Sequence, residues 1–235
     1  MVERSGLTGE RRARSAVAVS HLSSVIRPPS LITRHLGRVP YDRAYEDMRR
    51  FTAARSAATP DELWLLEHPP VYTVGQAGRL EHLLRETSIP VERVDRGGQI
   101  TFHGPGQLIA YALLDLRRRE LTVRRLVAAL EQAVIDLLAG YGIAGERRPG
   151  APGVYVAGAK IAALGLRVRN GCSYHGLALN VAMDLAPFGD IDPCGYAGLA
   201  VTQLADLGMA VGVSDVAGPL AVRVAAALRA SGPEA

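Results

Sequence analysis

The stretch AGAKIAALGLRVRNGCSYHGLALNV, residues 157–181, contains two runs in which apolar residues recur at every second position. The first run extends from Leu164 to Arg169, where leucine and valine alternate with glycine and arginine, and the second from His175 to Val181. Successive side chains of a β-strand point to opposite faces, so this period is typical of a strand that buries one face. The two runs therefore predict two β-strands.

The rest of the chain contains both strands and helices. Further strands are predicted at residues 31–36, 91–96 and 107–116 and in the continuous apolar run from Glu62, and helices at 41–58, 122–140 and 216–229. The helix at 122–140 has the clearest pattern, because its apolar residues share one helical face. Two or three strands often follow one another, which favours an α+β fold with a mixed sheet over a regular βαβ repeat.

Length and composition set the class of protein. The chain has 235 residues, 48% of them hydrophobic, so it can bury a core without disulfide bonds. Its two cysteines, Cys172 and Cys194, are too few for a disulfide scaffold and indicate a reducing compartment. The net charge of +4 is spread thinly and supports an acidic partner only weakly.

Residues 1–28 are predicted to form a disordered N-terminal extension, and residues 29–235 a single domain. Early arginines leave a signal or transit peptide open, but the apolar stretch after them is rich in serine and is interrupted by His21. No uncharged apolar run reaches the ~18 residues that span a bilayer. No membrane association is therefore expected, and the cytoplasm is the predicted location.

Lys160 is the only lysine in the sequence, because the other 26 of the 27 Lys and Arg residues are arginine. A lysine beside a cysteine lowers the pKa of the thiol and can also exchange a proton, whereas arginine stays protonated. Lys160 and Cys194 are therefore a candidate catalytic pair. Two alternatives stay open: Lys160 is an ordinary surface lysine left by an arginine bias, and Cys194 is a small buried apolar residue.

A second candidate site is the glycine-rich segment RGGQITFHGPGQL, residues 96–108. Its glycines permit tight turns and the close approach of a ligand to the backbone. The segment lacks the GxxxxGK[ST] spacing of a phosphate-binding loop and the GxGxxG spacing of a dinucleotide-binding loop. It is predicted either to bind a small molecule or to act as a simple hairpin, and one RGG triplet supports RNA binding only very weakly.

His175 falls on the same predicted strand face as Leu177 and Leu179, which is more typical of a hydrogen-bonded core histidine than of a catalyst. A zinc site of Cys172, His175 and Cys194 is disfavoured, because these residues lack the paired spacing of zinc-binding cysteines. Cys172 is therefore expected to pack in the interior.

Several stretches together resemble the octanoyltransferases of lipoate biosynthesis. They are LLEHPPVYTVG, DRGGQITFHGPGQLIAY, AGAKIAALGLRVRNGCSYHGLALNV and PCGYAGLAVTQL, within residues from about 31 to 225. Their conjunction is far more specific than any single motif. The resemblance implies the core shared with lipoate–protein and biotin–protein ligases, which is a mixed central β-sheet flanked by helices.

The resemblance also implies a two-step acyl transfer. Cys194 matches the family's nucleophile, which takes an octanoyl group from octanoyl-acyl carrier protein as a thioester, and Lys160 matches the lysine that lowers the pKa of that thiol. The implied acceptors are lysines of lipoyl domains in 2-oxoacid dehydrogenase complexes and of the glycine cleavage H protein, with no cofactor, metal or nucleic acid. The family's acyl-binding positions fall on Arg96, Gly97, Gly98, Gln99, Ile100, Thr101, Phe102, His103, Ala163, Leu164, Gly165, Gly176, Leu177 and Ala178. Phe102 replaces the tyrosine or tryptophan often found at its position.

The residue types at these positions suit an apolar acyl chain. Small residues would leave room beside the strands, and each buried methylene contributes ~0.8 kcal/mol. They are Ala162, Ala163, Gly165, Gly176 and Ala178. Transfer between thioesters is nearly neutral and the transfer to an amide is downhill, so no ATP is required.

Three other functions remain open from the sequence alone. An ATP-dependent lipoate or biotin ligase on the same core would have no need of Cys194. A cysteine hydrolase would use Cys194 together with His175 or His103 and would release the free acid. A non-enzymatic module would bind nucleic acid through the RGG segment.

Overall fold

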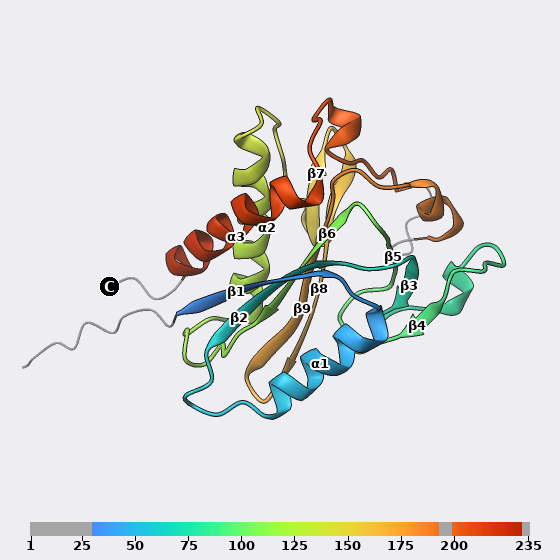
Figure 1. Cartoon of the computed structure of the whole chain (residues 1–235). Coiled ribbons are helices and arrows are strands. Elements are labelled where there is room, and N and C mark those ends of the chain that lie inside the picture. Colours follow the sequence, from blue (N-terminus) through green and yellow to red (C-terminus); the bar gives the residue numbers. More distant parts are fainter. Residues whose placement is uncertain (1–29, 193–198, 232–235) are drawn as a thin grey trace, which may run out of the picture.

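The computed structural model describes residues 30–192 and 199–231 (Figure 1). Within these residues a six-stranded sheet has the order β1-β2-β6-β9-β8-β7. β1 runs parallel to β2, and the other neighbouring strands are antiparallel. The predicted mixed central sheet is therefore confirmed. Its strands are β1 (Leu31–Arg38), β2 (Asp61–Glu67), β6 (Gln107–Leu113), β7 (Gly153–Val156), β8 (Ala159–Arg169) and β9 (Cys172–Asn180).

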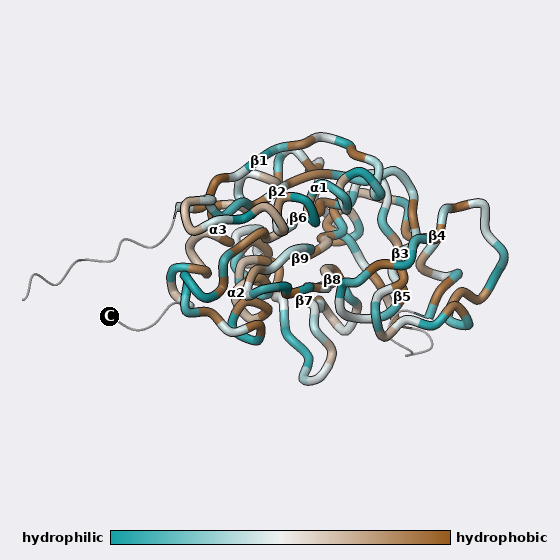
Figure 2. Tube along the Cα trace, turned by 90° about the horizontal axis from the view of Figure 1, so that it is seen from below, coloured by the Kyte–Doolittle hydropathy of each residue, from teal (hydrophilic) through white to brown (hydrophobic). Residues whose placement is uncertain are grey.

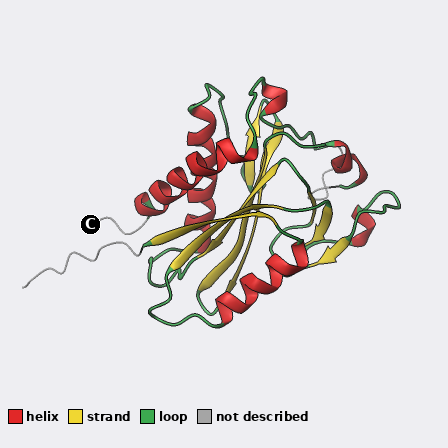
Figure 3. Cartoon of the chain, viewed as in Figure 1, coloured by secondary structure: helices red, strands yellow, loops and turns green. Residues whose placement is uncertain are grey.

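Helices cover both faces of this sheet (Figures 1 and 3). α2 (Val123–Ala139) and α3 (Val213–Ala230) pack on one face, over a large apolar cluster that includes leucines and alanines of β6 and β9. α1 (Tyr41–Ala53) packs on the other face, where Ala44 and Met48 meet Ile109 and Tyr111 of β6. The main sheet thus lies between two layers of helices, as expected for a mixed sheet flanked by helices.

A second, three-stranded sheet lies beside the main one (Figure 2). β3 (Val71–Val74) is central, with β4 (Val91–Arg93) parallel to it and β5 (Ile100–His103) antiparallel. The 3-10 helix η1 (Leu80–His82) lies in the excursion between β3 and β4. β3, β5 and β7 were not predicted, because strands of four residues bounded by glycine and proline show no measurable alternation.

One predicted helix matches the structure closely, and the other two have ends that differ from the prediction for identifiable reasons. α2 matches its prediction, with the Thr122 hydroxyl accepting from Arg125 N at 3.2 Å as the N-cap. α1 ends at Ala53, five residues before the predicted end, because the Arg55 side chain turns inward and donates to the Leu113 carbonyl. α3 starts three residues early, at Val213, where Asp215 accepts from Gly212 N at 2.8 Å.

Among the described residues, no helix combines the length and the apolar character that crossing a membrane requires. The predicted N-terminal extension, residues 1–28, lies outside the part of the chain that the structure describes.

Asp61, the first residue of β2, is fully buried and joins three segments through arginines. Its carboxylate accepts from Arg55 after α1, from Arg118 at 2.7 Å and from Arg119 at 2.5 Å. Asp115 N also donates to it at 2.9 Å. One buried carboxylate thus fixes the end of α1, the start of β2 and the loop after β6.

We predict that Asp61→Asn destabilises the fold by about 3–5 kcal/mol, because it removes the negative charge that balances buried arginines. Urea unfolding measures this loss. The matched control is Asp47→Asn on α1, since Asp47 pairs with Arg43 and Arg50 at an exposed site, where the expected change is about 0.5 kcal/mol or less. An equal loss in free energy of unfolding for the two variants would show that the buried cluster stabilises the fold no more than the exposed pair does.

Candidate functional site

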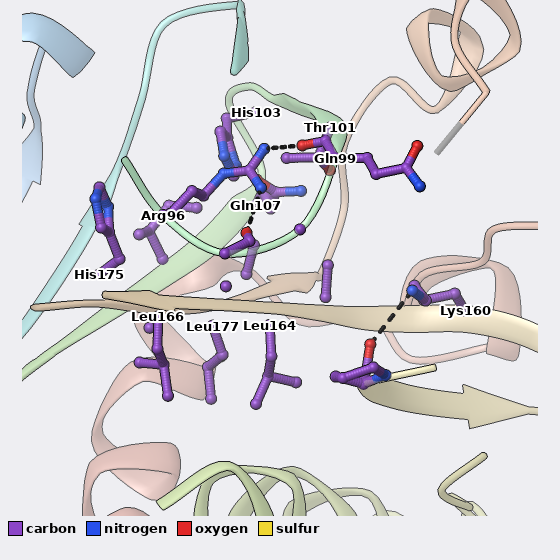
Figure 4. A pocket seen from close by; sticks show the side chains of 18 of the residues that line it. Arg96, Gln99, Thr101, His103, Gln107, Lys160, Leu164, Leu166, His175 and Leu177 are labelled. Carbon is purple, nitrogen blue, oxygen red and sulfur yellow. Dashed lines mark hydrogen bonds between the residues drawn. The ribbon is translucent and has the colours of Figure 1, made fainter. Parts of the chain in front are cut away.

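A cavity of about 270 Å³ lies between the main sheet and the glycine-rich turn that precedes β5. It is lined by residues 96–101, 103, 163–165 and 176–178, so every predicted acyl-binding residue except Phe102 contributes to it, and Lys160 lines it as well (Figure 4). Segments that are far apart in sequence therefore meet at one place, as the resemblance implied.

Phe102 is not among the cavity-lining residues. It belongs to β5, where Thr101 and His103 face the cavity, and the alternation of the strand turns Phe102 to the other side. Its ring centroid lies 5.4 Å from that of Tyr72 and 5.6 Å from that of Phe188. Phe102 thus packs in a separate apolar cluster behind the turn.

Lys160 reaches the cavity because β8 contains a β-bulge. Val154 pairs with Ala162 and Tyr155 pairs with Lys160, which leaves Ile161 as an extra residue. Ile161 and Ala162 both enter the apolar cluster under α2 and α3, so Lys160 and Ala163 share the opposite face. Strict alternation would instead have placed Lys160 on the helix-covered face.

The Lys160 side chain is 7% exposed and lies in a close-fitting pocket. Its Nζ is 3.4 Å from the Pro152 carbonyl and 5.2 Å from the centre of the Tyr155 ring. Gly153 has φ of +143°, and a Cβ there would lie 3.1 Å from the Lys160 Cε. The surface-lysine alternative is therefore wrong, since this lysine is buried against a glycine that leaves room for it.

Cys194, the predicted nucleophile, lies outside the described residues, so its pairing with Lys160 stays a prediction. The segments on either side of it are described. Asp192 N donates to the His82 carbonyl at 2.9 Å. On the other side, Lys160 N donates to the Ala200 carbonyl at 2.8 Å and Thr202 N donates to the Lys160 carbonyl at 3.0 Å. The chain after residue 198 thus pairs directly with the backbone of Lys160.

The glycine-rich turn is shaped by Arg96, whose side chain is 7% exposed. Its guanidinium donates to the Thr73 carbonyl at 2.6 Å, to the Thr73 hydroxyl at 2.8 Å and to the Gln99 carbonyl at 2.8 Å. Gly97 N donates to the Leu166 carbonyl at 2.9 Å, which fastens the turn to β8. The segment is therefore a cavity-lining turn with a fixed shape.

A chain of buried hydrogen bonds continues from this turn. The Thr73 hydroxyl, which accepts from Arg96, lies 3.3 Å from His103 Nε2, and His103 Nδ1 donates to Gln107 Oε1 at 2.8 Å. Burial lowers the pKa of His103 well below its usual value, so the ring is neutral. A neutral ring that donates through Nδ1 accepts through Nε2, which fits the Thr73 hydroxyl as donor.

The same chain ends beside Lys160. Gln107 Nε2 donates to Asn180 Oδ1 at 2.9 Å, and Asn180 Nδ2 donates to the Thr202 carbonyl at 3.0 Å. Asn180 also lines the cavity and was not predicted, because a single asparagine at the end of a strand gives no sequence signal. Tyr41, at the start of α1, is a second cavity residue that the sequence did not reveal.

His175 lies on the face opposite to the predicted one. Leu177 and Leu179 enter the cluster under α2 and α3, whereas the His175 ring stacks on Tyr45 of α1 with ring centroids 5.5 Å apart. Figure 4 shows His175 and Arg96 on one side of the ribbon and Leu177 on the other. The physical reason is the backbone of His175, which has φ of +59° and so breaks the alternation.

The described cysteine follows its prediction. Cys172 is buried at the start of β9, and its Sγ lies 3.7 Å from the Asn170 carbonyl. It therefore packs in the interior, as expected for a small apolar side chain.

His68 is a further buried histidine beside the cavity. Its Nδ1 donates to the Val39 carbonyl at 2.7 Å, so Nε2 accepts from the hydroxyl of Tyr111, also at 2.7 Å. Tyr111 itself lines the cavity. Burial lowers the pKa of His68 to about 4, which keeps the ring neutral at pH 7.

A family model and curated relatives match most of this chain. Residues 41–223 match the model of the lipoyl protein ligase A/B catalytic domain. The octanoyltransferase of Aromatoleum aromaticum is 66% identical over 188 residues, which cover 80% of this chain and 81% of that protein. The octanoyltransferase of Thiobacillus denitrificans is 67% identical over 181 residues, or 77% and 83% of the two chains.

Solved structures show the same fold at low sequence identity. Lipoate-protein ligase A bound with ATP is 14% identical with a TM-score of 0.67, covering 86% of each chain. The biotin protein ligase of Aquifex aeolicus in complex with biotin and ATP is 14% identical with a TM-score of 0.52, covering 84% of this chain and 70% of that one. The predicted fold class is confirmed.

The chain therefore belongs to the lipoyl protein ligase A/B catalytic-domain family. Within that family, the curated relatives that are 66% and 67% identical to it over the aligned residues are octanoyltransferases.

The low pKa of His68 predicts how stability changes with pH. An unfolded histidine titrates near 6.5, whereas the native ring titrates at about 4. The unfolded chain therefore binds this proton first, and the free energy of unfolding falls as the pH decreases from about 6.5 to about 4, by about 3 kcal/mol for this residue.

Urea unfolding at a series of pH values measures this dependence. His68→Gln should make the fall over this interval about 3 kcal/mol smaller than in the wild type. His35→Gln on the exposed strand β1 is the control and should leave the curve unchanged. A His68→Gln curve parallel to that of the wild type would contradict the assignment.

Proposed function

We propose that this protein transfers an octanoyl group from octanoyl-acyl carrier protein to a lysine of a lipoyl-domain protein, through a thioester on Cys194. The observation that carries the proposal is the cavity itself. Small and apolar residues of β8 and β9 line this cavity, and the buried Lys160 lines it as well. A relative that is 66% identical and named an octanoyltransferase supports an acyl chain as the occupant of this cavity.

In the proposed first step, the Cys194 thiolate attacks the carbonyl carbon of the donor thioester. The new sulfur–carbon bond forms as the bond to the carrier's sulfur breaks, and the departing thiolate takes up the proton of the Lys160 ammonium, which leaves Lys160 neutral for the second step. The ammonium of Lys160 favours the attacking thiolate by lowering the pKa of the Cys194 thiol. The product is an octanoyl-enzyme and a free carrier thiol.

In the proposed second step, the neutral amine of an acceptor lysine attacks the Cys194 thioester. The amide bond forms, the Cys194 thiolate leaves, and Lys160 in its neutral form accepts the proton that the attacking amine releases. Arginine would supply the charge of the first step but not the proton acceptor of the second. The two steps together require no ATP, because the energy of the donor thioester exceeds that of the amide.

The acyl chain is proposed to lie along β8 from Lys160 towards Gly165. Ala163 faces Ala178 and Gly165 faces Gly176 across the two strands, so these positions add almost no side-chain volume to the cavity. Buried methylenes of an eight-carbon chain would contribute several kcal/mol to binding, at ~0.8 kcal/mol each. The proposed donor is octanoyl-acyl carrier protein, the proposed acceptors are lipoyl domains of 2-oxoacid dehydrogenases and the glycine cleavage H protein, and the proposed compartment is the cytoplasm.

The other functions fit the site less well. Arg96 of the RGG segment is buried and donates to main-chain carbonyls, so its guanidinium is not presented to a nucleic-acid phosphate. As a base for a hydrolase, His103 has partners at both ring nitrogens, Gln107 and Thr73, and the His175 ring is stacked against Tyr45 and Tyr174. The lipoate and biotin ligases share the fold, which alone does not imply their ATP-dependent reaction.

The proposed catalytic pair predicts two different failures. Cys194→Ser should yield no octanoyl adduct, and Lys160→Arg should retain less than about 1% of the transfer rate, because proton exchange by a positioned base typically contributes 10²–10⁴-fold. Intact mass spectrometry after mixing with octanoyl carrier protein detects the adduct, which hydroxylamine should remove. Cys172→Ser is the matched control and should form the adduct normally. A fully active Lys160→Arg enzyme would refute the proton-transfer role.

The ligase alternative is separated by its need for ATP. We predict that purified protein transfers octanoate from the carrier protein to a lipoyl domain at the same rate with and without ATP, since the donor is already a thioester. Free octanoate with ATP should give no product. Transfer that requires ATP and accepts the free acid would establish the ligase instead.

A further inference from the structure

His175 has a backbone conformation that strands rarely contain. Its φ is +59° in the middle of β9, and its side chain is 1% exposed. A non-glycine residue in this region is strained and persists only where the surroundings require it. The adjacent Gly176 completes the distortion, because a Cβ there would lie 2.0 Å from the Ala110 carbonyl oxygen of β6.

The distortion moves the imidazole to the α1 side of the sheet. There the ring stacks between Tyr45 and Tyr174, with centroid distances of 5.5 Å and 5.1 Å. Its Nε2 lies 3.2 Å from Asp95 Oδ1, and the Tyr174 hydroxyl donates to Asp95 Oδ2. Burial alone would raise the pKa of Asp95, but these hydrogen bonds lower it well below its usual value, so the carboxylate is ionised.

Asp95 is the first residue of the turn that forms one wall of the cavity. The next residue, Arg96, is held by Thr73 and Gln99. The turn sits so close to β8 that a Cβ on Gly165 would lie 2.9 Å from the Gly97 carbonyl oxygen. Because the turn rests directly on β8, a shift of the turn by even a fraction of an ångström would change the shape of the cavity wall that it forms. Figure 4 shows Arg96 of this turn at the opposite side of the view from Lys160.

We propose that His175 is a positioning residue for acyl binding: its left-handed backbone aims the ring at Asp95 and thereby fixes the 95–99 turn over the distal end of the acyl cavity. This inference rests on the proposed octanoyl transfer. It assigns His175 to the fit and the length selectivity of the acyl chain, and it leaves the thiol chemistry at Lys160 unaffected.

The test uses His175→Gly, since glycine keeps the left-handed backbone without strain and removes only the ring. Steady-state kinetics with hexanoyl, octanoyl and decanoyl carrier proteins should show the KM for the octanoyl donor rising about tenfold, as expected for loss of one charge-assisted hydrogen bond. The kcat with octanoyl donor should change less than about twofold, and the preference for octanoyl over the other two chains should largely disappear.

Asp95→Asn tests the same contact from the other side and does not depend on the His175 backbone. It should reproduce the loss of chain-length preference, and the double variant should be no worse than His175→Gly alone, because the two side chains act as one unit. Circular dichroism and urea unfolding verify that the variants fold.

The outcomes separate this inference from the proposed function. A folded His175→Gly enzyme with wild-type KM and wild-type chain preference, or additive effects in the double variant, would overturn the positioning role. Failure of the proposed function would appear differently, as a wild-type protein that forms no octanoyl adduct at all.

Discussion

One chain of buried hydrogen bonds holds the two sheets of this protein in a fixed relation. It starts at the guanidinium of Arg96, passes through the neutral His103, and ends at the Thr202 carbonyl. The backbone N–H of Thr202 in turn donates to the Lys160 carbonyl. Each group in the chain is buried, so a broken link would leave an unsatisfied polar atom at a cost of about 1–3 kcal/mol. The turn that closes one end of the cavity and the lysine at the other end are thus parts of one rigid network.

Strand β8 contributes to both ends of the site because its pleat is interrupted once. The extra residue Ile161 lets the strand bury Ile161 and Ala162 under the helices while Lys160 and Ala163 face the cavity. β9 is also irregular, at His175. No residue is inserted there; instead, His175 itself has a left-handed backbone conformation. Both irregularities lie beside the cavity, which agrees with the tendency of bulges and strained residues to occur at functional sites.

These irregularities explain which features the sequence could predict. The helix α2 was predicted correctly because its pattern reflects burial of one face over many residues. The continuous apolar run of β2 was also predicted correctly, because both faces of that strand are buried. The face of His175 was predicted wrongly, because an alternating pattern contains no information about a single positive φ. The short strands β3, β5 and β7 were missed for lack of length. The family motifs predicted only part of the cavity lining. Residues such as Asn180, Tyr41 and Val127 required the fold that brings them there.

The contrast between Asp61 and Lys160 explains why a chain so rich in arginine has one lysine. Around Asp61, three guanidinium groups share one carboxylate, a role that needs permanent charge and several donors in fixed directions. At position 160 the side chain ends in a space bounded by Gly153, Pro152 and the Tyr155 ring, which suits a compact ammonium better than a planar guanidinium. The acyl transfer proposed above would also need, at this position, a group that can both carry and release a proton. The geometry of this space and the proposed chemistry therefore favour the same residue at position 160.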